Sequence, residues 1–166
     1  TLNFTIKSSK RTKEEAPMFK NEKKQRSSYP DYFIDKRLEI KSSEYTEGLG
    51  VYTTADIKMY ELVESSPVIL FNISILSEWQ DFHKHRHVLH EYPFVWPAGD
   101  AGCAISHGFG GLYNHRSEPN IRFNPNTNLK SMEFSALRDI SAGEELVIKY
   151  TSENKLWFNS FGGKQR

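Results

Sequence analysis

The chain is poor in the features that mark secreted and membrane-spanning proteins. Its 166 residues include one cysteine, Cys103, and a single thiol can form no intrachain disulfide and no zinc cluster by itself. No uninterrupted apolar run exceeds the four residues 68–71, whereas a bilayer-spanning helix needs about 20. The N-terminal residues also lack the apolar core of a secretory signal. These absences predict an intracellular protein without a membrane partner.

A strong overall charge is lacking too, but the charges that are present are unevenly distributed. The net charge is +1, yet residues 1–28 hold eight Lys and Arg against three Glu, and the remainder carries a net charge of −4. A basic arm on an acidic body can bind nucleic acid, rest on its own domain, or remain a solvated tail. The sequence leaves these alternatives open.

The residues that are present predict one soluble domain built from short strands. Apolar residues make up 37% and charged residues 26% of a chain of single-domain length. Short apolar runs bounded by turn residues predict strands at 38–41, 49–53, 62–71 and 146–150. Pro67 predicts a bend or an edge position within its run. Alternating apolar residues on either side of the Asn- and Pro-rich residues 124–128 predict a hairpin.

Two stretches depart from the strand pattern. Residues 74–90 combine a capping serine, Ser77, with apolar residues at helical spacing, and predict a helix. The glycine-rich residues 99–111 predict irregular backbone, because glycine weakens regular elements. The expected fold class is therefore a β-rich α+β domain at 29–166, with a helical insert at about 74–90, behind the basic arm at 1–28.

Three short segments carry the candidate chemistry. They are Gly-Leu-Gly-Val-Tyr at 48–52, Asn-His-x-x-x-Pro-Asn at 114–120, and Gly-Glu-Glu-Leu-x-x-x-Tyr at 143–150. Each alone also suits an ordinary turn or strand. Glycines in the first would let the backbone approach a ligand closely. It is not a dinucleotide fingerprint, since it lacks the third glycine and no helix follows.

In this order and spacing the three segments resemble the SET domain of protein-lysine methyltransferases, over about residues 38–158. The resemblance implies a β-clip fold with a knot-like crossing, in which the Asn-His segment passes beneath the loop of the last motif. It implies S-adenosylmethionine as cofactor, and in-line methyl transfer to a deprotonated lysine amine in a narrow aromatic channel. It implies no metal and no protein nucleophile. The zinc-binding cysteine clusters that flank many members are missing, so the chain resembles a compact member.

The resemblance also assigns roles to particular residues. It gives the catalytic role to Tyr150, whose hydroxyl would lie near the transferring methyl group. It places the cofactor against Gly48, Leu49, Gly50, Asn114, His115, Tyr150 and Trp157. It lines the lysine channel with Tyr92, Phe123, Ile148 and Phe158. For the aromatic residues, plain core packing is the alternative interpretation.

The sequence departs from the family pattern at three places. Arg116 stands where the family usually has serine, which puts in question the hydrogen bonding after His115. Residues 58–61 replace the usual glycine turn. No Tyr-x-Gly follows near Pro67, so Tyr92 is the candidate for that wall of the channel.

Histidines cluster at His83, His85, His87 and His90. Imidazole is a common metal ligand, but on a helix the first three point in different directions and no carboxylate or thiolate pattern completes a site. We therefore predict a solvated, pH-sensitive helical insert. Cys103 is predicted to be a small buried residue rather than a nucleophile, because no partnered base is evident.

The expected partner is a lysine-containing protein, either a histone or the chain's own lysine-rich arm. The protein would be nuclear if a eukaryotic histone is the substrate and cytoplasmic otherwise. The alternative is a SET-like module without turnover that binds a protein tail or nucleic acid, the latter through the basic arm. The sequence leaves the oligomeric state open.

Overall fold

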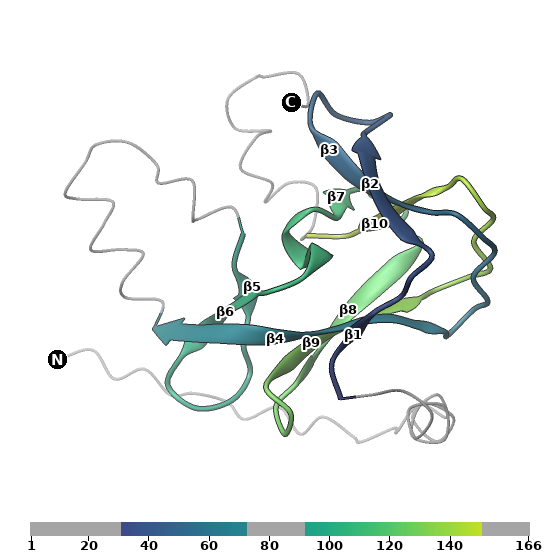
Figure 1. Ribbon diagram of the computed structural model, residues 1–166. Helices are drawn as coiled ribbons and strands as arrows, with labels where there is room; N and C mark the ends of the chain where they lie inside the picture. The colour runs from purple at the N-terminus through teal and green to yellow at the C-terminus, as the bar shows by residue number, and fades with distance from the viewer. Residues whose placement is uncertain (1–30, 73–91, 151–166) are drawn as a thin grey trace, which may run out of the picture.

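The computed structural model describes residues 31–72 and 92–150 (Figure 1). The predicted basic arm at 1–28, the helical insert at 74–90 with its histidines, Trp157 and Phe158 lie outside the described residues. The described part is β-rich, as predicted. Its one helical element is the short 3-10 turn η2 (Phe109–Gly111).

The strands form two sheets. The larger has the order β5-β6-β4-β9-β8, with β1 also paired to β4; the smaller has the order β2-β3-β10-β7. In chain order the strands are β1 (Phe33–Ile34), β2 (Leu38–Ser42), β3 (Leu49–Thr53), β4 (Leu62–Asn72), β5 (Phe94–Val95), β6 (Gly102–Ser106), β7 (Asn114–His115), β8 (Ile121–Asn126), β9 (Ser131–Ala136) and β10 (Glu145–Ile148). Figure 1 shows β4 running along the larger sheet, with β2, β3, β7 and β10 gathered beyond one side of it.

Strand β4 changes partners along its length at Pro67. Residues 62–67 pair with β9, whereas residues 68–72 pair with β6. Proline has no N–H to give to a ladder, so it is tolerated where one ladder ends and the next begins. The predicted special position of Pro67 corresponds to this exchange.

The predicted hairpin is β8–β9, but its turn lies later than expected. The pairing of Asn124 with Glu133 and of Pro125 with Met132 extends the strands past residue 125. The turn begins after Asn126, whose Oδ1 accepts a hydrogen bond from the Leu129 N–H at 3.0 Å, and includes Lys130 at φ 52°. Strand β8 lies at the end of its sheet, and an edge strand can accommodate a proline.

The glycine-rich stretch is only partly irregular, which corrects the prediction for residues 99–111. Gly99 and Gly102 have positive φ angles of 67° and 72°, as irregular backbone requires. The four residues after Gly102 contain no glycine, however, and complete strand β6 between β4 and β5. Cys103 lies in this strand and is buried, as predicted.

One hydrophobic core joins the two sheets. Val51 of β3 and Leu146 and Ile148 of β10 belong to the same buried cluster as Met132 and Phe134 of β9. In β9 these side chains alternate with the polar residues Glu133 and Ser135, so this strand presents one apolar face to the core, whereas all four residues of β10 are buried.

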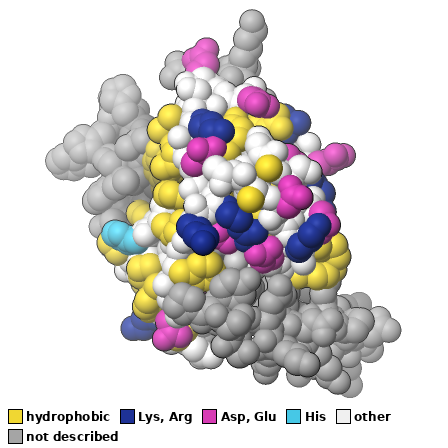
Figure 2. Space-filling model, turned by 45° about the vertical axis from the view of Figure 1, so that its right-hand side comes forward, with side chains coloured by type: hydrophobic (Ala, Val, Ile, Leu, Met, Phe, Trp, Pro, Cys, Tyr) yellow, Lys and Arg dark blue, Asp and Glu magenta, His cyan; other side chains and the backbone are white. Residues whose placement is uncertain are grey.

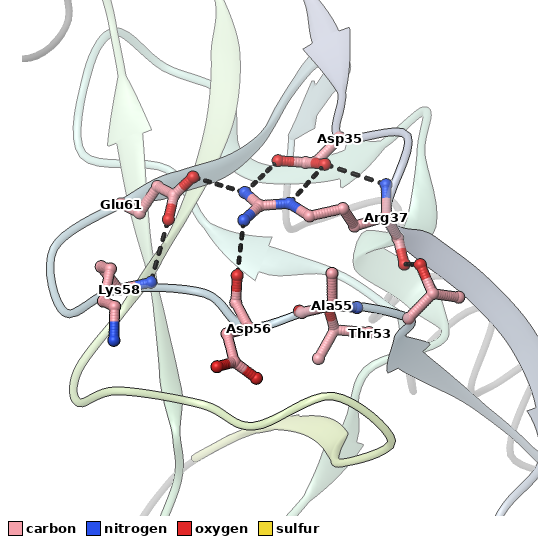
Figure 3. Close-up of polar contacts among 8 residues, drawn as sticks. Asp35, Arg37, Thr53, Ala55, Asp56, Lys58 and Glu61 are labelled. Atoms are coloured by element: carbon pink, nitrogen blue, oxygen red, sulfur yellow. Dashed lines mark hydrogen bonds and ion pairs between the residues drawn. The ribbon is translucent and has the colours of Figure 1, made fainter.

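A cluster of charged side chains ties the turn after β1 to the connection between β3 and β4 (Figure 3). The Arg37 guanidinium donates to both carboxylate oxygens of Asp35, to a carboxylate oxygen of Glu61, and to the Asp56 carbonyl. In the same connection Tyr60 adopts φ 69°, a conformation that favours glycine. Residues 58–61 thus turn the chain here without a glycine.

Candidate functional site

The third and fourth motifs lie side by side as two parallel strands. Asn114 of β7 pairs with Val147 of β10, and His115 pairs with Ile148. The Arg116 N–H donates to the Ile148 carbonyl at 2.9 Å, so the serine-to-arginine change leaves this backbone bond in place. Parallel neighbours cannot be joined by a tight turn. The chain therefore makes a wide excursion between them, and whether it forms the knot-like crossing remains a prediction.

Asn120, the last residue of the third motif, fastens the same junction. Its backbone N–H donates to the Val147 carbonyl at 3.2 Å, and its side-chain Oδ1 accepts from the Val147 N–H at 2.8 Å. Its Nδ2 donates to the Glu145 carbonyl at 2.8 Å. Only 3% of Asn120 is exposed. Its buried side-chain amide therefore pairs with backbone groups of β10 in place of a neighbouring strand.

The first motif joins the other two through Asn114. The Asn114 Nδ2 donates to the Leu49 carbonyl at 2.9 Å and to the Glu145 Oε1 at 2.6 Å. A carbonyl and a carboxylate both only accept hydrogen bonds, so these contacts determine which end of the amide is nitrogen. Among the described residues the Asn114 Oδ1 accepts no hydrogen bond. This oxygen is available to a ligand that donates one.

Gly50 has a steric role beside the cofactor contact that the resemblance assigned, which stays a prediction. A Cβ at Gly50 would lie 2.2 Å from the Glu145 Oε1, so the missing side chain makes room for a buried carboxylate. A Cβ at Gly48 would meet only the Thr46 Oγ1, at an ordinary 3.5 Å. Gly48 and Leu49 lie at the start of the motif, where the Leu49 carbonyl holds Asn114.

Tyr150 lies directly after β10 and contacts the third motif twice. Its hydroxyl donates to the Tyr113 carbonyl at 2.9 Å, and its backbone N–H donates to the His115 Nδ1 at 3.0 Å. The rings of His115 and Tyr150 lie 5.2 Å apart. These bonds orient the hydroxyl, while 42% of the residue stays exposed. Tyr150 is thus held in place while part of it remains at the surface.

Tyr113 is hydrogen-bonded to a buried carboxylate, that of Glu64. Glu64 of β4 is fully buried and accepts hydrogen bonds from the Tyr113 hydroxyl at 2.6 Å, the Ser66 Oγ at 2.5 Å and the Phe109 N–H at 2.9 Å. Burial raises the pKa of Glu64, and burial together with Glu64 raises the pKa of Tyr113 well above its usual range. A Cβ at Gly108 would lie 2.0 Å from both Glu64 and Ser66, so this glycine is required sterically.

A pocket of about 350 Å³ opens beside the 3-10 turn η2. Its lining comes from β6 and the 3-10 turn, together with one predicted channel residue: Tyr92, Ile105, Ser106, Gly108, Gly111 and Leu112. The Ser106 Oγ is buried and has no hydrogen-bond partner within the described chain. Buried polar atoms are nearly always paired, so this hydroxyl is an exception among the described residues.

The remaining predicted site residues are placed as follows. Tyr92 lines the pocket and is 42% exposed. Ile148 is 1% exposed in the core, and Phe123 packs against that core with its ring centroid 4.9 Å from that of Phe94. The structure thus puts neither Phe123 nor Ile148 in the pocket lining.

Sequence reasoning missed three residues at the centre of the site. Glu145 was part of a quoted motif, but its side chain had no assigned role. Tyr113 directly precedes the Asn-His pair. Glu64 gave the clearest signal, because it is the one charged residue within the run of residues 62–71, and a buried charge requires partners.

Two further kinds of site were sought in the described residues. Within 31–72 and 92–150, no three His, Cys, Asp or Glu side chains gather closely enough to hold a metal ion. No helix in this part of the chain is long and apolar enough to cross a membrane.

The same chain is similar to known proteins over most of its length. The SET domain family model matches residues 48–151. A histone-lysine N-methyltransferase of Schizosaccharomyces pombe, specific for lysine 37 of histone H3, is 34% identical over 121 residues, which cover 73% of this chain and 76% of that protein. The crystal structure of a candidate histone methyltransferase from Plasmodium falciparum has a TM-score of 0.55 at 24% identity, covering 75% of this chain and 99% of the other. The last likeness concerns the fold alone.

Proposed function

This chain belongs to the SET-domain family of protein-lysine methyltransferases, and on that premise we propose that it transfers the methyl group of S-adenosylmethionine to the amine of a protein lysine. One observation carries the proposal. Residues of all three motifs are joined by direct hydrogen bonds, Asn114 to Leu49 and Glu145, and His115 to Tyr150. Residues that lie about 100 positions apart in the sequence therefore form one polar site.

The hydrogen-bonding groups of the site fit the proposed cofactor. S-adenosylmethionine carries an α-ammonium group, which donates hydrogen bonds, and a sulfonium methyl, which is the electrophile when the cofactor is bound. The unpartnered Asn114 Oδ1 is an acceptor suited to the ammonium group. The backbone at Leu49 and the segment around His115 lie on either side of Asn114. We assign the cofactor's amino-acid end to this place.

Tyr150 and Tyr113 provide the oxygen atoms proposed to face the reaction. The Tyr150 hydroxyl is held on the Tyr113 carbonyl before any substrate arrives. Such prearranged dipoles stabilise developing charge without having to reorganise during the reaction. Holding two reactants in line also removes much of the entropic barrier to a bimolecular step.

The lysine amine must lose its proton before it can attack. A largely apolar pocket disfavours the ammonium form and lowers the lysine pKa. Ile105 and Leu112 and the ring of Tyr92 line the pocket beside the site, and Leu112 directly precedes Tyr113 in the chain. We assign the entry of the lysine to this pocket.

The substrate class proposed is a histone, which would place the protein in the nucleus. The relative from Schizosaccharomyces pombe is named for histone H3 lysine 37. Figure 2 shows Lys and Arg side chains interspersed with Asp and Glu across the middle of the face drawn. Among the described residues, Arg37, Lys58 and Arg138 are each ion-paired with a carboxylate. Nucleic-acid binding relies on Lys and Arg that neutralise phosphates, and on this face they alternate with carboxylates.

The experiment that tests this function is a methyl-transfer assay. The full chain is incubated with S-adenosylmethionine labelled in its methyl group and with recombinant histones, the chain itself being present as a second acceptor. We expect label on a histone lysine, located by mass spectrometry. Label on nucleic acid, or no transfer to any protein although the cofactor binds, would contradict the proposal.

A further inference from the structure

We propose that Glu145 is a positioning residue for methyl transfer, whose buried carboxylate holds the Asn114 amide so that only the Oδ1 is left for the cofactor. This inference rests on the function proposed above and extends it to a residue that does not itself touch substrate or cofactor. It concerns which end of one amide faces the ligand.

Glu145 is a buried carboxylate surrounded by hydrogen-bond donors. The residue is 4% exposed. Its oxygens accept from the Ser43 Oγ at 3.0 and 2.9 Å, the Glu44 N–H at 3.3 Å, the Tyr52 hydroxyl at 2.9 Å and the Asn114 Nδ2 at 2.6 Å. All of these donors are neutral, so oriented dipoles rather than a cation accommodate this carboxylate. The bond to Asn114 is the shortest of these.

The four donors come from separate parts of the smaller sheet. Ser43 and Glu44 follow β2, Tyr52 lies in β3, and Asn114 lies in β7. Burial and the bond to Glu145 raise the pKa of Tyr52 to about 12, so its hydroxyl stays a donor at neutral pH. The carboxylate is therefore held by groups outside the motif it belongs to, and its position does not depend on a ligand.

The consequence for Asn114 follows from the valence of its amide. The Asn114 nitrogen has two hydrogens, and it donates to Glu145 and to the Leu49 carbonyl. The last torsion of an asparagine side chain is broad and roughly two-fold, so packing alone does not select one end. Without the carboxylate, only the Leu49 carbonyl would still favour this end of the amide, and an amide that flips would present N–H groups to the cofactor's ammonium and repel it.

Gly50 provides independent support, because it leaves the space that the carboxylate fills. A Cβ there would lie 2.2 Å from the Glu145 Oε1 and 2.5 Å from its carboxyl carbon. A glycine of the first motif is thus explained by Glu145 of the fourth motif. Gly50, Glu145 and Asn114 thus act together to orient the Asn114 amide.

The test compares two neighbouring substitutions of the same kind. Glu145→Gln replaces one acceptor oxygen by an amide that donates, whereas Glu144→Gln changes a partly exposed carboxylate bonded to Arg138 and Ser141. Calorimetry with S-adenosylhomocysteine measures the affinity of each full-length variant. We expect Glu145→Gln to weaken binding about tenfold, the loss expected for one hydrogen bond to a charged group, and Glu144→Gln to bind as the wild type does.

A double-mutant cycle separates positioning from a general loss of structure. If Glu145 acts through Asn114, Glu145→Gln adds little in the Asn114→Ala background, because the group it orients is already absent. Equal effects in both backgrounds, or wild-type affinity of Glu145→Gln, would overturn the inference. If Glu145→Gln shows no cooperative thermal transition, the affinity of Tyr52→Phe is measured instead, because this variant removes one hydrogen-bond donor to the Glu145 carboxylate. Unchanged cofactor affinity in Tyr52→Phe also overturns the proposal.

One readout does not depend on cofactor binding. In a ¹H–¹⁵N spectrum of the free protein, the side-chain NH₂ pair that disappears in Asn114→Ala should shift in Glu145→Gln and stay in place in Glu144→Gln. An unshifted pair in Glu145→Gln overturns the inference. If the NH₂ pair shifts in Glu145→Gln but the wild-type protein binds no cofactor, the proposed function is refuted and the orientation of Asn114 still stands.

Discussion

Tyr150 is bound at both its backbone and its hydroxyl, and the two bonds have different roles. The backbone bond to the His115 ring fixes where the residue lies, and the hydroxyl bond to the Tyr113 carbonyl fixes where its oxygen points. A phenylalanine would keep the first bond and lose the second. The position therefore allows a substitution that separates catalysis from structure.

We expect Tyr150→Phe to lower the rate of methyl transfer on the order of 100-fold, the loss typical for one oriented group at a reacting centre. Cofactor affinity and the unfolding transition should change little. Single-turnover kinetics and calorimetry measure the two effects. Tyr32→Phe is the matched control, because its exposed hydroxyl also donates to a backbone carbonyl, that of Leu129. A Tyr150→Phe enzyme as fast as this control would contradict the assignment.

Asn114 provides a second prediction at the scale of one residue. Asn114→Ala should weaken S-adenosylmethionine binding by about tenfold, because a polar group of the ligand loses its partner. Equilibrium binding measured by calorimetry tests this. Asn126→Ala is a suitable control, since Asn126 also donates to a glutamate, Glu133, at 2.8 Å but lies at the β8–β9 turn. Equal affinities of the two variants would show that Asn114 does not face the cofactor.

At the scale of elements, a group of ion pairs joins two connections between strands. Arg37 follows β1, and its guanidinium reaches Asp35, Glu61 and the Asp56 carbonyl (Figure 3). Its side chain is 22% exposed, so the cluster is shielded from water on most sides. The cluster holds the turn before β2 against the connection that leads into β4.

Removing the guanidinium would leave two carboxylates and a carbonyl facing one another. We expect Arg37→Ala to lower the free energy of unfolding by ~1–2 kcal/mol, the lower part of the range for bonds to charged groups, because water still reaches the site. Urea denaturation measures the change. Lys58→Ala breaks an exposed pair with Asp139 and should unfold at the wild-type denaturant midpoint. A larger effect for Lys58 than for Arg37 would refute this account.

At the scale of the whole molecule, Glu64 couples stability to pH. Burial raises its pKa above the ordinary value of 4.5, so the folded protein binds this proton more readily than the unfolded chain does. The contribution of Glu64 to the free energy of unfolding is therefore greatest below about pH 4.5 and falls as the pH rises through the raised pKa. Glu144 has the opposite sign, because its bond to Arg138 lowers its pKa.

These signs predict opposite trends for two glutamine variants. Relative to wild type, Glu64→Gln should gain stability as the pH rises above about 4.5, because the cost of a buried charge is gone. Glu144→Gln should lose relative stability as the pH rises towards 4.5, because the wild-type ion pair forms there. Urea denaturation from about pH 3 to pH 7 measures both trends. Parallel trends in the two variants would contradict the assigned pKa directions.

Local pattern was sufficient for most of the longer strands, whereas the two-residue strands β1, β5 and β7 were not predicted. Strands β2, β3, β4 and the β8–β9 hairpin were predicted from alternation and turn residues, because period-two alternation reflects one buried face. The family was identified from three motifs in order. The strand inside the glycine-rich stretch was missed, since four residues show no clear period, and the turn of the hairpin was placed too early because Asn and Pro also suit an edge strand.

What the sequence determined by itself, then, was most of the longer strands, the family and the residue types at the site: an asparagine, a tyrosine and glycines. What only the tertiary structure decided was which of these groups touch. Glu145 lies 93 residues from Tyr52 and 102 from Ser43, and Glu64 lies 49 from Tyr113. Such bonds form because distant strands are brought together around a shared core, and no local period records them. The physical reason is that burial forces each carboxylate to find donors wherever the fold brings them.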